Sequence, residues 1–111
     1  MDINEAQTIV DQWIKATDKG YFSPVTNVAV LVEEVGELAH IVLRRYGEQR
    51  AKECDRTDDA ALAEELADVL WVTMALANQT GINLADAFKA GHNKRVVRDA
   101  NRFDKKSSKS L

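Results

Sequence analysis

Two pairs of carboxylates have the most informative spacing in this sequence. Glu34 and Glu37 lie three residues apart, and Glu65 and Asp68 repeat that spacing. Apolar residues recur every three or four positions around both pairs, which predicts that both segments are helical. In an α-helix, residues three apart are separated by about 60° and lie on one face. The sequence therefore predicts two helices that each carry two carboxylates on one side.

The carboxylates fall within the apolar stripe of each predicted helix, whereas an ordinary amphipathic helix places its acids opposite that stripe. The stripe around Glu34 comprises Asn27, Val30, Leu31, Leu38 and Ile41. The stripe around Glu65 comprises Ala61, Leu62, Val69, Val72 and Leu76. If the two stripes face each other, four carboxylates meet in a partly dry space. The alternative is that all four are ordinary solvated charges.

Four ionised, unpaired carboxylates in such a space would be strongly destabilising. Raised pKa values or a bound divalent cation would relieve that repulsion. Oxygen donors without cysteine or paired histidine ligands suit a hard ion, so we expect Mg²⁺, with Mn²⁺ as a substitute. Glu33 lies about 100° from Glu34, at the rim of the stripe.

A basic cluster is predicted on the last helix. The face that begins with Leu84 and Phe88 continues into four basic residues, Lys94, Arg95, Arg98 and Arg102. Such a cluster could hold the outer phosphates of a polyphosphate, with arginine making forked contacts. The alternative is a solvated basic end that is favourable to the helix dipole.

Turn-forming residues are scarce, with one proline and five glycines, so the sequence predicts an all-α fold rather than a β-sandwich. We expect four helices, at about 2–18, 25–46, 59–80 and 84–103, with Gly91 as a possible kink in the last. A polar loop at 48–58 separates the middle two. One domain is predicted over residues 1–103, followed by a disordered basic tail at 104–111.

Composition excludes several classes of protein. The net charge of −3 disfavours a nucleic-acid polymer as partner, because duplex-binding proteins are normally basic. A single cysteine, Cys54, allows no internal disulfide and no cysteine-based zinc site. No stretch resembles a secretory signal or a membrane span, so we expect a cytoplasmic protein.

The acidic blocks give the chain a family resemblance. Glu33-Glu34-Val35-Gly36-Glu37 and Glu65-Leu66-Ala67-Asp68 resemble the Glu-Glu-x-x-Glu and Glu-x-x-Asp blocks of the MazG-like all-α nucleoside triphosphate pyrophosphohydrolases. Tyr21-Phe22-Ser23-Pro24, ahead of the first block, also fits. Lys94-Arg95 and Arg98 match a basic segment of the family more loosely. The resemblance covers roughly residues 5–103.

The resemblance implies hydrolysis of a nucleoside triphosphate between the α and β phosphates, giving a monophosphate and pyrophosphate, with Mg²⁺ as cofactor. It implies Glu34, Glu37, Glu65 and Asp68 as metal ligands. Lys94, Arg95 and Arg98 would then contact the distal phosphates, and Glu33 or a ligand carboxylate would accept the proton of the attacking water. Family members often remove non-standard nucleotides.

The resemblance also implies a helical bundle completed by dimerisation, or a tetramer, with sites near the subunit interface. The size of the chain supports this, because one seam cannot use all its apolar surface. The surplus is expected at Val10, Ile14, Trp71, Val72 and Met74. Four aromatic residues, which are core candidates, could instead stack on a nucleobase: Trp13, Tyr21, Phe22 and Trp71.

Two other classes compete with this hypothesis. Glu37-x-x-His40 has the spacing of a ferritin-like di-iron site, but Asp68 stands where the matching helix would need a histidine. A non-catalytic helical module for partner binding or regulation is the other alternative. In that case, neutralising Glu34 and Asp68 should stabilise the fold and change no activity.

Overall fold

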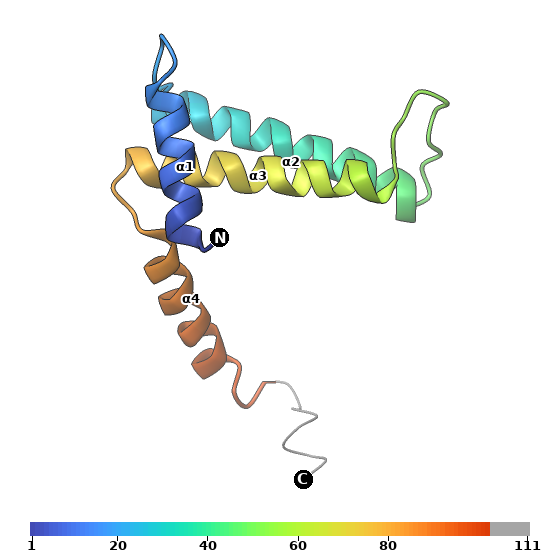
Figure 1. Ribbon diagram of the computed structural model, residues 1–111. Helices are drawn as coiled ribbons and strands as arrows, with labels where there is room; N and C mark the ends of the chain where they lie inside the picture. The colour runs from blue at the N-terminus through green and yellow to red at the C-terminus, as the bar shows by residue number, and fades with distance from the viewer. Residues whose placement is uncertain (103–111) are drawn as a thin grey trace.

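The computed structural model describes residues 1–102, which form four α-helices and no strand (Figure 1). The helices are α1 (Ile3–Lys15), α2 (Pro24–Tyr46), α3 (Asp59–Gln79) and α4 (Leu84–Arg98). The prediction of an all-α, four-helix chain is therefore confirmed. The predicted disordered tail at 104–111 lies outside the described residues.

Each helix begins at a side chain that caps its free N–H groups. The caps are Asp2, Ser23, Asp58 and Asn83, and each accepts a hydrogen bond from the N–H three residues on. Pro24 follows its cap at the first helical position, where its missing N–H costs nothing. The beginnings of the helices therefore lie within two residues of the predicted ones.

Two helices end earlier in the sequence than predicted, at Lys15 rather than about residue 18 and at Arg98 rather than about residue 103. Helix α1 ends at Lys15, and its end is followed by a bond from the Thr17 hydroxyl to the Ile14 carbonyl. Gly20 then turns the chain at a φ of 65°, which favours glycine. Helix α4 ends at Arg98, whose guanidinium binds the Asp99 carboxylate. It passes through Gly91 as one continuous helix.

Helices α2 and α3 form a long hairpin, and α1 crosses α3 near the start of α2 (Figure 1). The buried core lies at this crossing and consists of Val10, Ile14, Met74 and Ala75. Tyr21 and Leu84 pack against it from the side. Burial of these side chains is what joins α1 to the hairpin.

A buried amide, Gln7, ties α1 to the connection between α3 and α4. Its Nε2 donates to the Asn78 side chain and to the Ile82 carbonyl, both at 3.0 Å, and its Oε1 accepts from the Leu84 N–H at 2.8 Å. Both N–H donors and the oxygen of this amide therefore have partners, as burial requires. This arrangement fixes where α4 starts.

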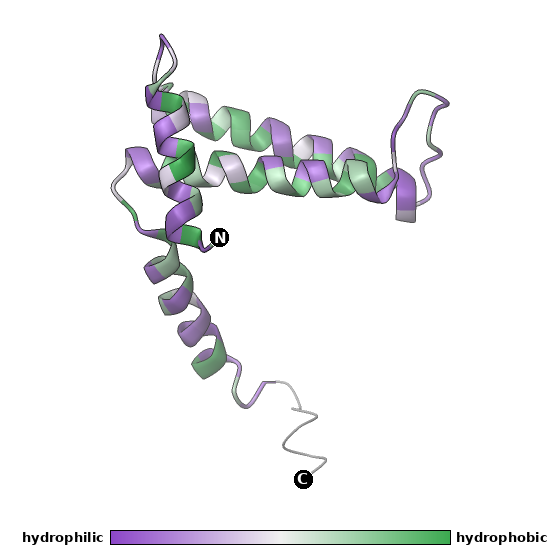
Figure 2. Cartoon of the chain, viewed as in Figure 1, coloured by the Kyte–Doolittle hydropathy of each residue, from purple (hydrophilic) through white to green (hydrophobic). Residues whose placement is uncertain are grey.

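A large apolar surface remains uncovered in the single chain. Helix α4 has no buried residue, and five valines of α2 are exposed: Val25, Val28, Val32, Val35 and Val42. Figure 2 shows hydrophobic stretches along both helices. The radius of gyration is 18.0 Å, against about 13 Å for a compact domain of this length. The prediction of which apolar residues would stay uncovered was mostly wrong, because four of the five are buried: Val10, Ile14, Val72 and Met74. Trp71 is the exception at 39% exposed, and the other large exposed apolar side chains occur on all four helices, with the largest share on α2.

Candidate functional site

The acidic site lies in the seam between α2 and α3. Asn27 and Ile41 are buried on α2, and Ala61 and Val72 are buried on α3. The two apolar stripes therefore face each other, which is the arrangement that brings the carboxylates of the two helices together. The carboxylates within the stripes are consequently turned toward the neighbouring helix.

Three of the four predicted ligands converge. Glu34, Glu37 and Glu65 each offer one carboxylate oxygen, and these oxygens all lie within 4.8 Å of one another. Asp68 is outside this group, although its charge raises the pKa of both Glu34 and Glu65. The cluster therefore joins two carboxylates of α2 to one of α3, with the fourth close by.

The local environment disfavours ionisation of these acids. Burial is the main cause that raises the pKa of Glu65 to about 7, followed by the charge of Glu37. Burial, followed by the Glu37 charge, also raises the pKa of Glu34. The buried Oε2 atoms of Glu34 and Glu65 have no hydrogen-bond partner within residues 1–102. Unpartnered carboxylate oxygens at this spacing fit a hard divalent cation.

A pocket of about 480 Å³ opens beside the cluster. It is lined by Glu33, Gly36, Glu37, His40, Ile41 and Glu65, and we call it the acid-lined pocket. Glu33 is exposed at its edge, as its position at the rim of the stripe predicts. The pocket therefore leaves Glu37 and Glu65 open to water and small ions.

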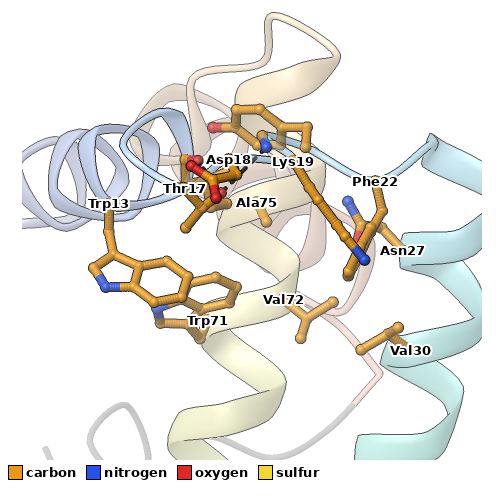
Figure 3. A pocket seen from close by; sticks show the side chains of 13 residues that line it. Trp13, Thr17, Asp18, Lys19, Phe22, Asn27, Val30, Trp71, Val72 and Ala75 are labelled. Carbon is orange, nitrogen blue, oxygen red and sulfur yellow. Dashed lines mark hydrogen bonds between the residues drawn. The ribbon is translucent and has the colours of Figure 1, made fainter.

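An aromatic pocket of about 410 Å³ lies between α1 and the start of α2 (Figure 3). Trp13 and Trp71 meet edge to face, with ring centroids 5.8 Å apart. Phe22 and Val30 lie across the pocket from them (Figure 3). Val30 is one helical turn before Glu34, so the aromatic pocket and the acidic site are neighbours along α2.

The predicted basic residues are not assembled with the acids in the single chain. Lys94, Arg95 and Arg98 are exposed on α4, which leaves the other helices near the start of α1 (Figure 1). The Arg98 guanidinium contacts the Asp99 carboxylate through two hydrogen bonds of 3.0 Å. These basic groups therefore lie outside the acidic site of their own chain.

The loop at 48–58 contains a residue that contacts α2, and the sequence did not predict this contact. Asp55 binds two residues of α2, His40 at 3.1 Å and Arg44 at 3.4 Å. The Asp55 carboxylate also accepts a hydrogen bond from the Lys52 N–H, which is typical of a turn. An aspartate in such a turn does not indicate from the sequence that it will contact α2. His40 is thus engaged with Asp55 and is not in the group of converging carboxylates, which argues against the di-iron arrangement.

Comparison with known proteins shows where this chain belongs. Residues 22–103 match the MazG nucleotide pyrophosphohydrolase domain. The chain is a member of that family. YpjD of Bacillus subtilis (strain 168) is 40% identical over 104 residues, which are 94% of this chain and 92% of YpjD. YvdC of the same organism is 32% identical over 103 residues, 88% of this chain and 96% of YvdC.

Solved structures of MazG relatives share the fold. The crystal structure of B. subtilis YpjD superposes with a TM-score of 0.73 at 40% identity, over 91% of this chain and 96% of that one. The crystal structure of a MazG protein conserved in Bacillus, described as a nucleotide pyrophosphohydrolase, gives 0.72 at 38% identity, over 85% and 88%. Within residues 1–102, no helix of this MazG-family chain has the length and apolarity needed to cross a membrane.

Proposed function

We propose that this MazG-family protein is a Mg²⁺-dependent nucleoside triphosphate pyrophosphohydrolase. It cleaves between the α and β phosphates and releases a nucleoside monophosphate and pyrophosphate. The observation that supports this most strongly is the convergence of Glu34, Glu37 and Glu65 around buried oxygens without partners. The proposed catalytic domain spans residues 1–103, and its proposed role is removal of unwanted nucleotides in the cytoplasm.

The carboxylates of Glu34, Glu37, Glu65 and Asp68 would hold the cation. A bound Mg²⁺, or Mn²⁺ in its place, supplies charge neutralisation between the acids and the triphosphate and lowers the pKa of a water. Glu33 is exposed at the edge of the acid-lined pocket and is the candidate acceptor of the proton from the attacking water. Its exposure keeps it free to exchange that proton with solvent.

The aromatic pocket is the candidate site for the nucleobase. Its edge-to-face tryptophans, Trp13 and Trp71, offer ring surfaces for stacking. Asn27 lines the same pocket, and its Nδ2 donates one hydrogen bond to Gln79 at 2.7 Å, which leaves its oxygen and its second N–H as available groups. The cation held by the neighbouring acids would then receive the phosphates of the same nucleotide.

The site is completed in a homodimer, or in a tetramer built from such dimers. The exposed face of α2 has a heptad-like spacing of three and four residues, formed by Val25, Val28, Val32, Val35, Ala39 and Val42. A second copy packed on this face would cover it. The same assembly would bring Lys94, Arg95 and Arg98 of one α4 toward the phosphates held by the other chain.

The test is a product assay with a panel of standard and modified nucleoside triphosphates and Mg²⁺. We expect equal amounts of monophosphate and pyrophosphate for the preferred substrate, and none after chelation of the metal. Release of inorganic phosphate would contradict the proposed cleavage position. Absence of turnover with every triphosphate, in a folded protein that binds Mg²⁺, would favour the non-catalytic module.

A further inference from the structure

The loop between α2 and α3 is attached to α2 at one residue. Asp55 has a largely buried side chain, 14% exposed, although the loop around it is exposed. Its Oδ1 lies 3.1 Å from His40 Nε2, and its Oδ2 accepts from the Lys52 N–H at 2.8 Å. Arg44 Nε lies 3.4 Å from the same Oδ2. Asp55 thus links the loop to α2 through two side chains.

The Asp55 carboxylate can only accept hydrogen bonds in its ionised form. The Lys52 N–H is the main cause that lowers its pKa, and the bond to His40 is the next. Nε2 of His40 must therefore be the donor, which defines one ring nitrogen and orients the imidazole. The opposite ring nitrogen, Nδ1, is left for another partner.

His40 is also a wall of the acid-lined pocket, which it shares with Glu33, Glu37 and Glu65. It lies one turn after Glu37 on α2, and its side chain is 46% exposed. A histidine whose Nε2 is held by a carboxylate and whose side chain lines the pocket of the proposed site is an oriented polar group there. The proposed reaction does not otherwise use it.

We propose that Asp55 is a positioning residue, which orients the His40 imidazole at the acid-lined pocket and holds the loop against α2. This inference rests on the proposed function for its catalytic consequence. His40 then presents a fixed polar group to the substrate phosphates or to the attacking water. Loss of Asp55 leaves all four acids in place, so Mg²⁺ affinity should be unchanged while turnover falls.

The main experiment compares Asp55→Ala with Glu53→Gln in the full chain. Glu53 is an exposed acid of the same loop with no hydrogen bond or ion pair within residues 1–102, so it is a matched control. We expect Asp55→Ala to lower kcat about tenfold, as loss of an orienting partner does elsewhere, and Glu53→Gln to leave it unchanged. Asp55→Glu should restore part of the loss.

A double-mutant cycle tests whether Asp55 acts through His40. In a His40→Ala background, Asp55→Ala should cause no further loss of kcat. An undiminished loss in that background would overturn the proposal, as would a kcat equal to that of Glu53→Gln. If Asp55→Ala does not fold, Asp55→Asn replaces it, because the amide oxygen can still accept from the Lys52 N–H.

A second readout needs no enzyme activity and separates failure of this proposal from failure of the proposed function. Trypsin can cut the loop after Arg50, Lys52 and Arg56. We expect cleavage there to be faster in Asp55→Ala than in Glu53→Gln at equal thermal stability. Equal rates would overturn the attachment of the loop. Faster cleavage in a protein without turnover on any triphosphate would retain the attachment and reject its catalytic role.

Discussion

The α2–α3 hairpin and helix α4 carry opposite charges and are supported by the fold in opposite ways. The acids of the hairpin lie in a packed seam, with two carboxylate oxygens buried and without partners within residues 1–102. The basic residues of α4 lie on a helix with no buried residue. Packing therefore holds the acids in place within one chain, whereas the basic residues are fixed only where α4 begins.

This difference shows which half of the proposed site is preorganised. Repulsion among the acids destabilises the folded chain, but burial of the surrounding apolar stripe contributes more free energy in the opposite direction. The basic side chains of α4 are exposed, so solvent and salt screen their mutual repulsion, but this helix also gains no burial. In the proposed dimer a second chain would supply that burial, and the α4 side chains would then reach an acidic site that is already formed.

The greatest loss of activity is predicted for substitutions in the acidic part of the proposed site. Glu34→Gln combined with Asp68→Asn should lower turnover by about a thousandfold or more, because the cation loses two ligands. Mg²⁺ binding, measured by calorimetry, should disappear with it. The metal-free protein should become more stable to heat, since repulsion is relieved. Glu64→Gln, at an exposed rim position, is the control and should retain activity and binding.

The next effect concerns the surface that would bring the two halves together. Val32→Glu with Val35→Glu places charges in the exposed face of α2 and should convert the proposed dimer into monomers, measured by sedimentation. Turnover should fall in parallel, because α4 of the second chain no longer reaches the site. Gln12→Glu adds a charge to exposed α1 and should remain dimeric. A dimeric valine variant would show that the subunits meet elsewhere.

A smaller effect is expected from the basic half. Lys94→Ala or Arg95→Ala should raise KM for the triphosphate about tenfold with a smaller change in kcat. Arg98→Ala should have less effect, because Asp99 already binds that guanidinium. Lys89→Ala, off the basic face, is the matched control. Steady-state kinetics at one ionic strength would distinguish these variants. If all of them had the same KM as the unmodified protein, α4 would not contribute to the binding of the triphosphate.

The weakest predicted effect is a pH dependence of the stability of the metal-free protein. The Glu65 carboxyl binds its proton more tightly in the folded protein than an ordinary glutamate does, because burial raises its pKa from 4.5 to about 7. The free energy of unfolding of the metal-free protein should therefore fall as pH rises across that interval, and then stay level. Saturating Mg²⁺ should reduce this fall. Thermal melts with and without the metal would measure it, and identical profiles would contradict metal binding at these acids.

Sequence periodicity predicted the hairpin well, because helical spacing alone decides which side chains share a face. Asn27 and Ile41 lie on the packed side of α2, as expected, and Glu34 is turned into the seam with them. The caps at Ser23 and Asn83 placed the helix starts, since an N-cap acts within one turn of the chain. These features depend on local geometry.

Periodicity failed where two surfaces compete for the same kind of residue. Val10 and Met74 were expected to remain uncovered, yet they form the core where α1 crosses α3. The valines of α2, such as Val32 at 65% exposure, are uncovered instead. An apolar side chain does not specify which neighbour will cover it, so only the packing of the whole chain could decide.

By itself, the sequence determined four helices, their starts and two acidic stripes, because each follows from the order of residues over a few turns. The tertiary structure decided that three carboxylates converge, that α4 stands apart from them, and that Asp55 reaches back to His40. Those contacts join residues distant in the chain. Their formation depends on the crossing of helices and the path of a loop, which no local pattern encodes.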